Sequence, residues 1–265
     1  MGRIVKLVLY FFLYQLVVAG GMSGLFMIWH GKFPDPSDDC YITYLLVIQV
    51  TFTMIVCMHL LFGKYVCLDR KALAYYNSGK VLLLSLFFIV GMGLWNNYLN
   101  ELVDLPNTME VFFDKMMVHP LGVFATVVMA PLMEELFFRG AIEGHLLRVW
   151  KNPVGAIVIS SLLFGVVHGN PAQIPFAFVV GMGLGWMYYI TGSLVPCIFM
   201  HFINNGTAVL TFWIVGDSEA SLLKTLGFDL ATVVALAGAG ITVLSVYGIR
   251  QLFRNKSVKW IAEDA

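Results

Sequence analysis

The chain of 265 residues contains eight apolar runs, each about as long as a helix must be to cross a lipid bilayer. A bilayer core near 30 Å thick requires about 20 apolar residues in helical form. Backbone groups in lipid must find their hydrogen bonds within the protein, so each run is expected to be a helix. The runs occupy residues 4–29, 41–63, 80–99, 119–148, 153–169, 172–190, 194–215 and 230–253.

The composition agrees with a membrane protein. Of the residues, 59% are hydrophobic and only 12% are charged, a balance outside the range of ordinary soluble domains. The sequence therefore predicts an all-α, polytopic membrane helix bundle with about eight transmembrane helices. Its expected surroundings are the lipid bilayer, and no nucleic-acid partner is expected.

The basic residues predict the orientation of the bundle, because Lys and Arg gather on the cytoplasmic side. With eight helices and a cytoplasmic N-terminus, only Lys32, Lys115 and Lys224 fall outside. Adding or removing one helix in mid-chain would destroy this skew, so it favours eight helices with both termini in the cytoplasm. The residues assigned to the cytoplasmic side are Arg3, Lys6, Lys64, Arg70, Lys71, Lys80, Arg148, Lys151, Arg250, Arg254, Lys256 and Lys259.

No linker or low-complexity tract divides the chain, so a single membrane domain, 1–265, is expected. Polar residues at membrane depth are concentrated in one part of it. The helices between residues 119 and 210 carry nearly all of them, which predicts a catalytic core there, with 1–100 and 230–265 as peripheral transmembrane helices. Within the core, Gly181 and Gly185 have the G-x-x-x-G spacing that permits close helix packing.

Two adjacent acids, Glu134 and Glu135, and the basic Arg139 stand in the fourth run. Ionisable residues at membrane depth are costly and by default mark a functional site. Glu135 and Arg139 are four residues apart and share a helix face, whereas Glu134 diverges by about 100°. We expect a supporting pair, Glu135 with Arg139, and one acid, Glu134, that faces a cavity. Pro131 cannot donate to the carbonyl of Val127, so the helix is expected to open there.

Two histidines and an amide on later helices could act with Glu134. His201 and Asn205 share a helix face, and His168 closes the fifth run. A buried carboxylate of this kind can serve as a general base. Two histidines and a glutamate could also bind zinc, with Glu134, His168 and His201 as ligands, but no H-E-x-x-H motif occurs, so the metal is left open. The remaining histidines are expected to be packing or membrane-edge residues: His30, His59, His119 and His145.

Three motifs occur in order on successive membrane helices: E-E-x-x-x-R at 134–139, F-x-x-x-H at 164–168 and H-x-x-x-N at 201–205. Together they resemble the type II CAAX prenyl endopeptidase family, a broad group of intramembrane proteases also called CPBP or Abi. The resemblance covers about 119–210. It implies hydrolysis of a peptide bond in a membrane-associated peptide or protein, and the expected location is the bacterial cell membrane.

The resemblance also implies a role for each residue. Glu134 would activate water with help from His168, while His201 and Asn205 would stabilise the oxyanion. Glu135 and Arg139 match the motif and would act as support. This mechanism requires no cofactor, and zinc is not excluded. One feature conflicts with a compact site: the predicted boundaries put His168 and His201 near opposite membrane faces, so either those boundaries are displaced or the helices are broken or tilted.

Other interpretations were weighed. The segment Gly21-Met22-Ser23-Gly24 resembles the G-x-S-G motif of rhomboid proteases, but a rhomboid would leave the acids and the arginine of 134–139 unexplained. The chain could instead be a non-catalytic regulatory or immunity scaffold of the same fold, or a proton-coupled transporter. Transporters often have paired repeats with broken helices in both halves. Here the polar residues gather in one half.

Overall fold

The computed structural model describes residues 2–35, 40–66, 68, 78–103, 105–150, 152–216, 222–256, 258 and 260. Within these ranges the regular structure is entirely helical, which confirms the predicted all-α fold. Each of the eight apolar runs forms a helix. Seven are α1 (Gly2–His30), α2 (Tyr41–Phe62), α4 (Ser78–Val103), α9 (Pro153–Val166), α10 (Ile174–Thr191), α11 (Leu194–Val215) and α12 (Leu222–Leu252), and the eighth is the composite helix of residues 120–149.

Seven of these helices are long and apolar enough to cross a membrane. The exception is α9, which has 14 residues. At 1.5 Å per residue it measures about 21 Å, less than the thickness of a bilayer core. Eight apolar helices are thus present as predicted, but α9 is too short to span the membrane alone.

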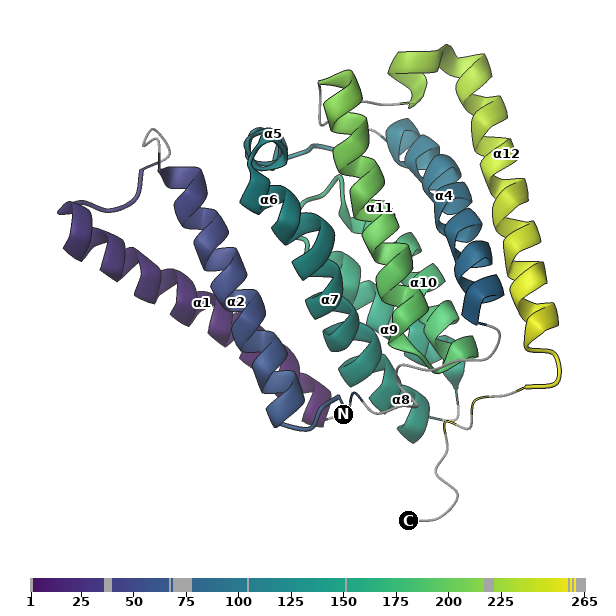
Figure 1. Cartoon of the computed structure of the whole chain (residues 1–265), viewed down its shortest axis with the longest axis horizontal. Helices are drawn as coiled ribbons and strands as arrows, with labels where there is room; N and C mark the ends of the chain where they lie inside the picture. Colours follow the sequence, from purple (N-terminus) through teal and green to yellow (C-terminus); the bar gives the residue numbers. More distant parts are fainter. Residues whose placement is uncertain are drawn as a thin grey trace.

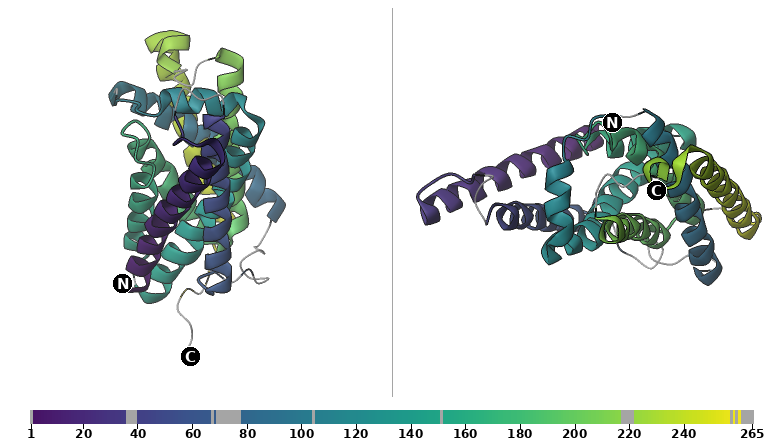
Figure 2. Two further views of the ribbon diagram at one scale, coloured as in Figure 1. Left: turned by 90° about the vertical axis from the view of Figure 1, so that its left-hand side faces the viewer. Right: turned by 90° about the horizontal axis from the view of Figure 1, so that it is seen from above.

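The helices stand roughly side by side in one bundle (Figure 1). On one side α4 packs along α12, and in the middle α9 and α10 form a hairpin beside α11. The pair α1 and α2 projects from the other side (Figure 2). The first turn of α1 and the last turn of α12 lie at the same end of the bundle, as expected for eight helices that alternate in direction. Which side of the membrane this end faces stays a prediction, and Arg70, Lys71, Lys151 and Lys259 lie outside the described residues.

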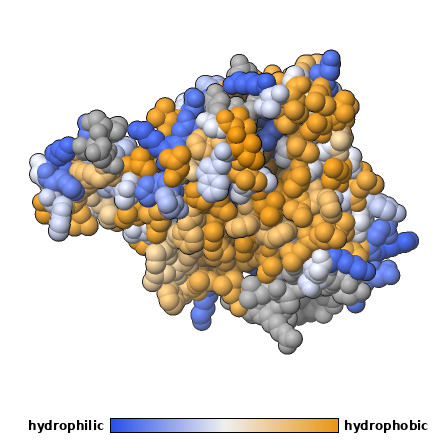
Figure 3. All heavy atoms as spheres, turned by 45° about the horizontal axis from the view of Figure 1, so that its top comes forward, coloured by the Kyte–Doolittle hydropathy of each residue, from blue (hydrophilic) through white to orange (hydrophobic). Residues whose placement is uncertain are grey.

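The outer surface is apolar. Large side chains such as Leu16 (72% exposed) and Leu244 (70% exposed) point away from the bundle. In Figure 3, apolar atoms cover most of the visible face, and polar atoms gather towards its margins. An apolar surface of this extent is far larger than the patches that soluble monomers expose. It fits a multi-pass integral membrane protein whose outer faces contact lipid.

The composite helix of residues 120–149 is irregular. It consists of α6 (Pro120–Phe124), the π-helix η1 (Ala125–Met129), α7 (Ala130–Glu134), the π-helix η2 (Glu135–Glu143) and α8 (Gly144–Val149). The π-helix is rare and occurs most often as short insertions near functional sites. The opening predicted around Pro131 is therefore present. The π-helix η1 ends at Met129, and Pro131 is the second residue of α7.

The π-helical register changes which backbone carbonyl the proline leaves without a hydrogen-bond donor. The N–H of Ala130 donates to the carbonyl of Ala125, five residues back. In the same register Pro131 would serve the carbonyl of Thr126, but proline has no N–H to donate. The carbonyl left without its helical partner is thus that of Thr126, whereas α-helical geometry had pointed to Val127.

The two spaced glycines of α10 allow close packing, as predicted. A methyl group at Gly181 would lie 3.0 Å from Cβ of Ser161 on α9. One at Gly185 would lie only 2.6 Å from a carboxyl oxygen of Glu143 in η2. The missing side chains therefore let α10 lie directly against both α9 and η2.

Candidate active site

A buried guanidinium organises the centre of the bundle. Arg139 is fully buried and donates from Nη1 to Oε1 of Glu135 at 3.0 Å. It also donates from Nη2 to the carbonyl of Gly181 at 3.0 Å, and it lies over the ring of Phe164 with 4.6 Å from Cζ to the ring centre. The predicted pair of Glu135 and Arg139 is confirmed, and it is anchored to α10 and α9.

Both acids of the motif meet one imidazole. His201 Nδ1 lies 2.8 Å from Oε1 of Glu135, and His201 Nε2 lies 3.8 Å from Oε2 of Glu134. An ionised carboxylate only accepts hydrogen bonds, so Nδ1 carries the hydrogen shared with Glu135. The Nε2 edge is thereby turned towards Glu134. Adjacent helical residues were expected to diverge, yet the change from α7 to η2 between them lets both reach His201.

The two acids differ in exposure in the direction that helical geometry predicted. The side chain of Glu135 is 0% exposed, whereas that of Glu134 is 17% exposed. Oε2 of Glu134 is itself buried and has no hydrogen-bond partner among the described residues. Oε2 of Glu135 likewise has no partner among the described residues, but Oε1 of Glu135 is held by Arg139 and His201, so Glu134 is distinguished by its partial access.

His168 lies two residues beyond the end of α9. Its Nδ1 is 2.7 Å from the carbonyl oxygen of Phe164, and because a carbonyl only accepts, Nδ1 carries the hydrogen. The lone pair of the neutral ring is then on Nε2. The ring of Phe164 contacts both imidazoles, with centroid distances of 5.1 Å to His168 and 5.6 Å to His201. Among the described contacts none joins His168 directly to Glu134.

The short α9 places His168 near His201. A helix of about 21 Å that begins at one end of the bundle ends inside it. His168 is thereby brought to the ring of Phe164, which also contacts His201. The position of the two histidines in the membrane stays a prediction.

Buried amides hold the loop that carries His168. Asn100 donates to the carbonyl of Ala172 at 2.9 Å. The fully buried Asn170 donates to Oδ1 of Asn107 at 2.8 Å and accepts from the backbone N–H of Thr108 at 3.2 Å. These contacts tie the loop to α4 and to the segment before α5 (Glu110–Val118). The sequence analysis did not single out these asparagines, although amides beside apolar helices were a visible signal.

Asn205 compensates for the proline in the composite helix. Its Nδ2 donates to the carbonyl of Thr126 at 2.9 Å, which is the carbonyl that Pro131 cannot serve. Its Oδ1 accepts from Asn204 at 3.1 Å. An amide nitrogen has two hydrogens, so one remains beyond the Thr126 contact. The proposed contribution of Asn205 to an oxyanion site stays a prediction.

The donor set was tested for a metal. Glu134 Oε2 and His201 Nε2 supply two potential ligands 3.8 Å apart. A catalytic zinc ion takes three protein ligands, and within the described part of the chain no group of three or more His, Cys, Asp or Glu side chains could hold one ion. The arrangement does not fit such a site, so the mechanism below is derived without a metal.

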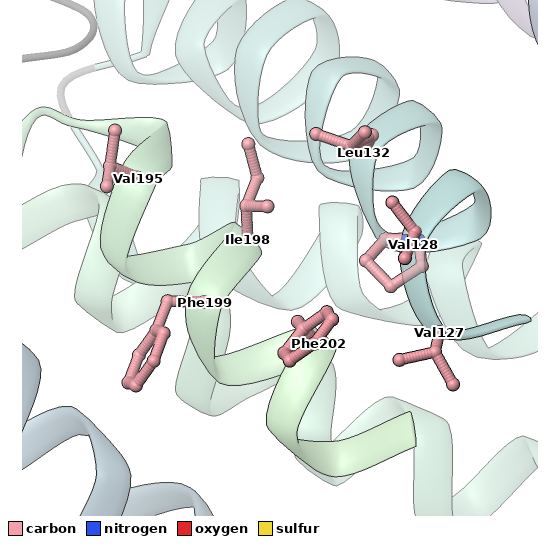
Figure 4. Close-up of a pocket in the computed structure, with 8 residues that line it drawn as sticks. Val127, Val128, Leu132, Val195, Ile198, Phe199 and Phe202 are labelled. Atoms are coloured by element: carbon pink, nitrogen blue, oxygen red, sulfur yellow. The ribbon is translucent and has the colours of Figure 1, made fainter. Parts of the chain in front are cut away.

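An apolar groove adjoins the two facing groups. It has a volume of about 270 Å³, and its walls come from the η1–α7 segment and from α11 (Figure 4). Glu134 follows the groove residue Pro131 by three positions, and His201 follows Ile198 by three, so both are neighbours of the groove on their helices. The residues that line it are Val127, Val128, Pro131, Leu132, Val195, Ile198, Phe199 and Phe202.

The site therefore consists of two adjacent glutamates that face one histidine within a helical membrane bundle, with an apolar groove nearby. Comparison with known proteins finds a match over part of the chain: residues 117–207 match the model of type II CAAX prenyl endopeptidase Rce1-like proteins. The match covers about a third of the chain and agrees with the resemblance seen in the sequence. No solved structure matches the chain.

Three curated bacterial proteins are similar to this chain. The membrane-embedded CAAX protease MroQ of Staphylococcus aureus is 33% identical over 34% of this chain and 39% of its own length. The putative membrane peptidase YdiL of Bacillus subtilis is 28% identical over 38% of this chain and 41% of its own length. YyaK of Bacillus subtilis, an uncharacterized protein, is 36% identical over 31% of each chain. The matches thus span about two fifths or less of these relatives. With the seven apolar helices, they confirm the predicted location in a bacterial membrane.

Proposed function

We propose that this protein is an intramembrane endopeptidase that hydrolyses a peptide bond of a membrane-associated protein or peptide. The observation that carries the proposal is the position of Glu134, partly exposed and 3.8 Å from the Nε2 edge of a histidine whose other nitrogen is held by Glu135. The match to Rce1-like endopeptidases supports it, as do the names of MroQ and YdiL.

In the proposed reaction Glu134 takes a proton from a water molecule as the water oxygen attacks the peptide carbonyl carbon. His168 assists through the lone pair on its Nε2. The carbonyl oxygen gains negative charge, which His201 and the second amide hydrogen of Asn205 stabilise. The C–N bond then breaks, and the proton passes from Glu134 to the leaving amine.

His201 can donate to the oxyanion only while both ring nitrogens carry hydrogen. Glu135 accepts from Nδ1 and holds the ring in position. Arg139 in turn donates to the same carboxyl group and holds it in place. In this mechanism the contacts from Arg139 to Glu135 and from Glu135 to His201 orient the imidazole opposite Glu134.

The proposal is tested with purified protein in lipid vesicles and a labelled peptide that contains one apolar segment. Mass spectrometry of the products would locate the bond that is cut. We expect cleavage at or near the border of the apolar segment, because the groove beside Glu134 and His201 suits such a segment. Intact peptide after long incubation with a panel of such segments would contradict the proposed activity.

Filling the groove should weaken substrate binding. We expect Val128→Trp to raise KM about tenfold, equivalent to about 1.4 kcal/mol, and to leave kcat within about twofold. The matched control is Val154→Trp, which adds the same side chain at an exposed position outside the groove lining. Equal KM values for the two variants would exclude the groove as the substrate subsite.

Activity should survive removal of metal ions. After treatment with a strong zinc chelator and removal of the complex, we expect kcat/KM to stay within about twofold of the untreated enzyme, since the proposed water activation uses Glu134 directly. Activity is measured before chelation, after it and after added zinc. Loss on chelation with recovery on zinc addition would make Glu134 and His201 metal ligands and overturn the metal-free mechanism.

A further inference from the structure

A third buried acid lies behind the proposed site and has no part in the mechanism above. Glu143 is the last residue of η2, is 0% exposed, and neither carboxyl oxygen has a hydrogen-bond partner among the described residues. It fills the space that Gly185 leaves on α10, and Ile157 of α9 closes the same space. The bundle thus encloses an acidic side chain at a position where packing alone would favour an apolar one.

A second unpartnered polar group belongs to Arg139. Its two terminal nitrogens are bonded to Glu135 and Gly181, but its buried Nε has no partner. Glu135 stands four residues before Arg139 and Glu143 four residues after it, so the two acids are one turn away on either side.

Buried polar groups are nearly always satisfied, by protein atoms or by ordered water. Glu143 has free acceptor oxygens, and Arg139 has a free donor on the adjacent turn. One buried water that accepts from Arg139 Nε–H and donates to a carboxyl oxygen of Glu143 would satisfy both groups. The guanidinium would then be held on all sides: by Glu135, by the Gly181 carbonyl, by the Phe164 ring and by Glu143.

We propose that Glu143 is a positioning residue, which fixes Arg139 across one buried water and thereby keeps Glu135 and His201 aligned with Glu134. This role rests on the proposed endopeptidase function. It acts through hydrogen bonding, so a side chain of the same shape with an accepting oxygen should replace it. An apolar side chain should fill the space but leave Arg139 Nε unsatisfied.

The test compares Glu143→Gln with Glu143→Met in the full chain. We expect Glu143→Gln to keep kcat within about threefold of wild type. Glu143→Met should lower kcat about tenfold with KM within about twofold, while its thermal midpoint is equal to or above that of wild type. Stability that rises as kcat falls is not the result of a merely structural role. Ile142→Val, a change at the adjacent buried residue, is the packing control.

A second measurement does not depend on catalysis. In ¹⁵N-histidine spectra, the Nδ1–H of His201 should give a downfield hydrogen-bonded signal, identified by its loss in His201→Gln. We expect Glu143→Gln to retain that signal and Glu143→Met to shift or broaden it. If the wild-type protein cuts no peptide, the proposed function fails and this signal still tests the positioning role. Wild-type kcat and an unchanged signal in Glu143→Met, or failure of that variant to fold, would overturn it.

Discussion

Glu134→Gln is expected to lower kcat for peptide hydrolysis by about 10³-fold and to leave the fold unchanged, because proton transfer by a positioned side chain contributes roughly 10²–10⁴-fold to catalysis. Glutamine keeps the length and shape of the side chain but cannot take a proton from water. His201 keeps its contacts with Glu135 and with the Phe164 ring, which the substitution leaves in place. Single-turnover cleavage in vesicles measures the loss of the chemical step.

The matched control is Glu110→Gln, the same chemical change on α5 (Glu110–Val118), outside the proposed site. It should keep kcat within about twofold of wild type. A Glu134→Gln enzyme with a tenth or more of wild-type kcat would rule out Glu134 as the general base. If neither wild type nor variant cleaves while a proton flux depends on Glu134, the transporter interpretation replaces the protease.

The helices could be predicted because a bilayer leaves few choices. A run of about 20 apolar residues must satisfy its own backbone, so hydropathy alone gives the positions of α1, α2, α4 and α12. Hydropathy could not show that α9 stops after 14 residues. Gly169, with a φ of 64°, and Pro171 are local signals for this stop. Asn100 and Asn170 hold the loop through contacts with distant parts of the chain.

The site was predictable where it depends on spacing along one helix. Glu135 and Arg139 pair because residues four apart share a face, and this holds in the fold. The meeting of Glu134 and Glu135 at His201 was not predictable, because it requires the change from α7 to η2. The preceding change from η1 to α7 involves Pro131 and the amide of Asn205, which donates to the carbonyl the proline leaves free. When a side chain of a second helix sets the backbone hydrogen-bond register, the periodicity of the first helix's own sequence does not reveal it.

The largest effect on stability is expected at Arg139. Arg139→Met leaves the carboxylate of Glu135 buried at 0% exposure with only His201 as a partner. Removing one member of a buried ion pair typically costs about 3–5 kcal/mol, and we expect a loss of this size in the free energy of unfolding. The contacts with the Gly181 carbonyl and the Phe164 ring are lost as well. Reversible unfolding in mixed micelles measures the difference.

The double variant Arg139→Met with Glu135→Gln distinguishes the charge from the packing. Glutamine no longer needs a cation and can still accept from His201 Nδ1, so the double variant should regain all but about 1–2 kcal/mol. Arg148→Met, an exposed arginine in α8, is the control and should change stability by less than about 0.5 kcal/mol. If Arg139→Met alone were as stable as wild type, Glu135 would not depend on Arg139, and the chain of contacts that orients His201 would begin at Glu135 itself.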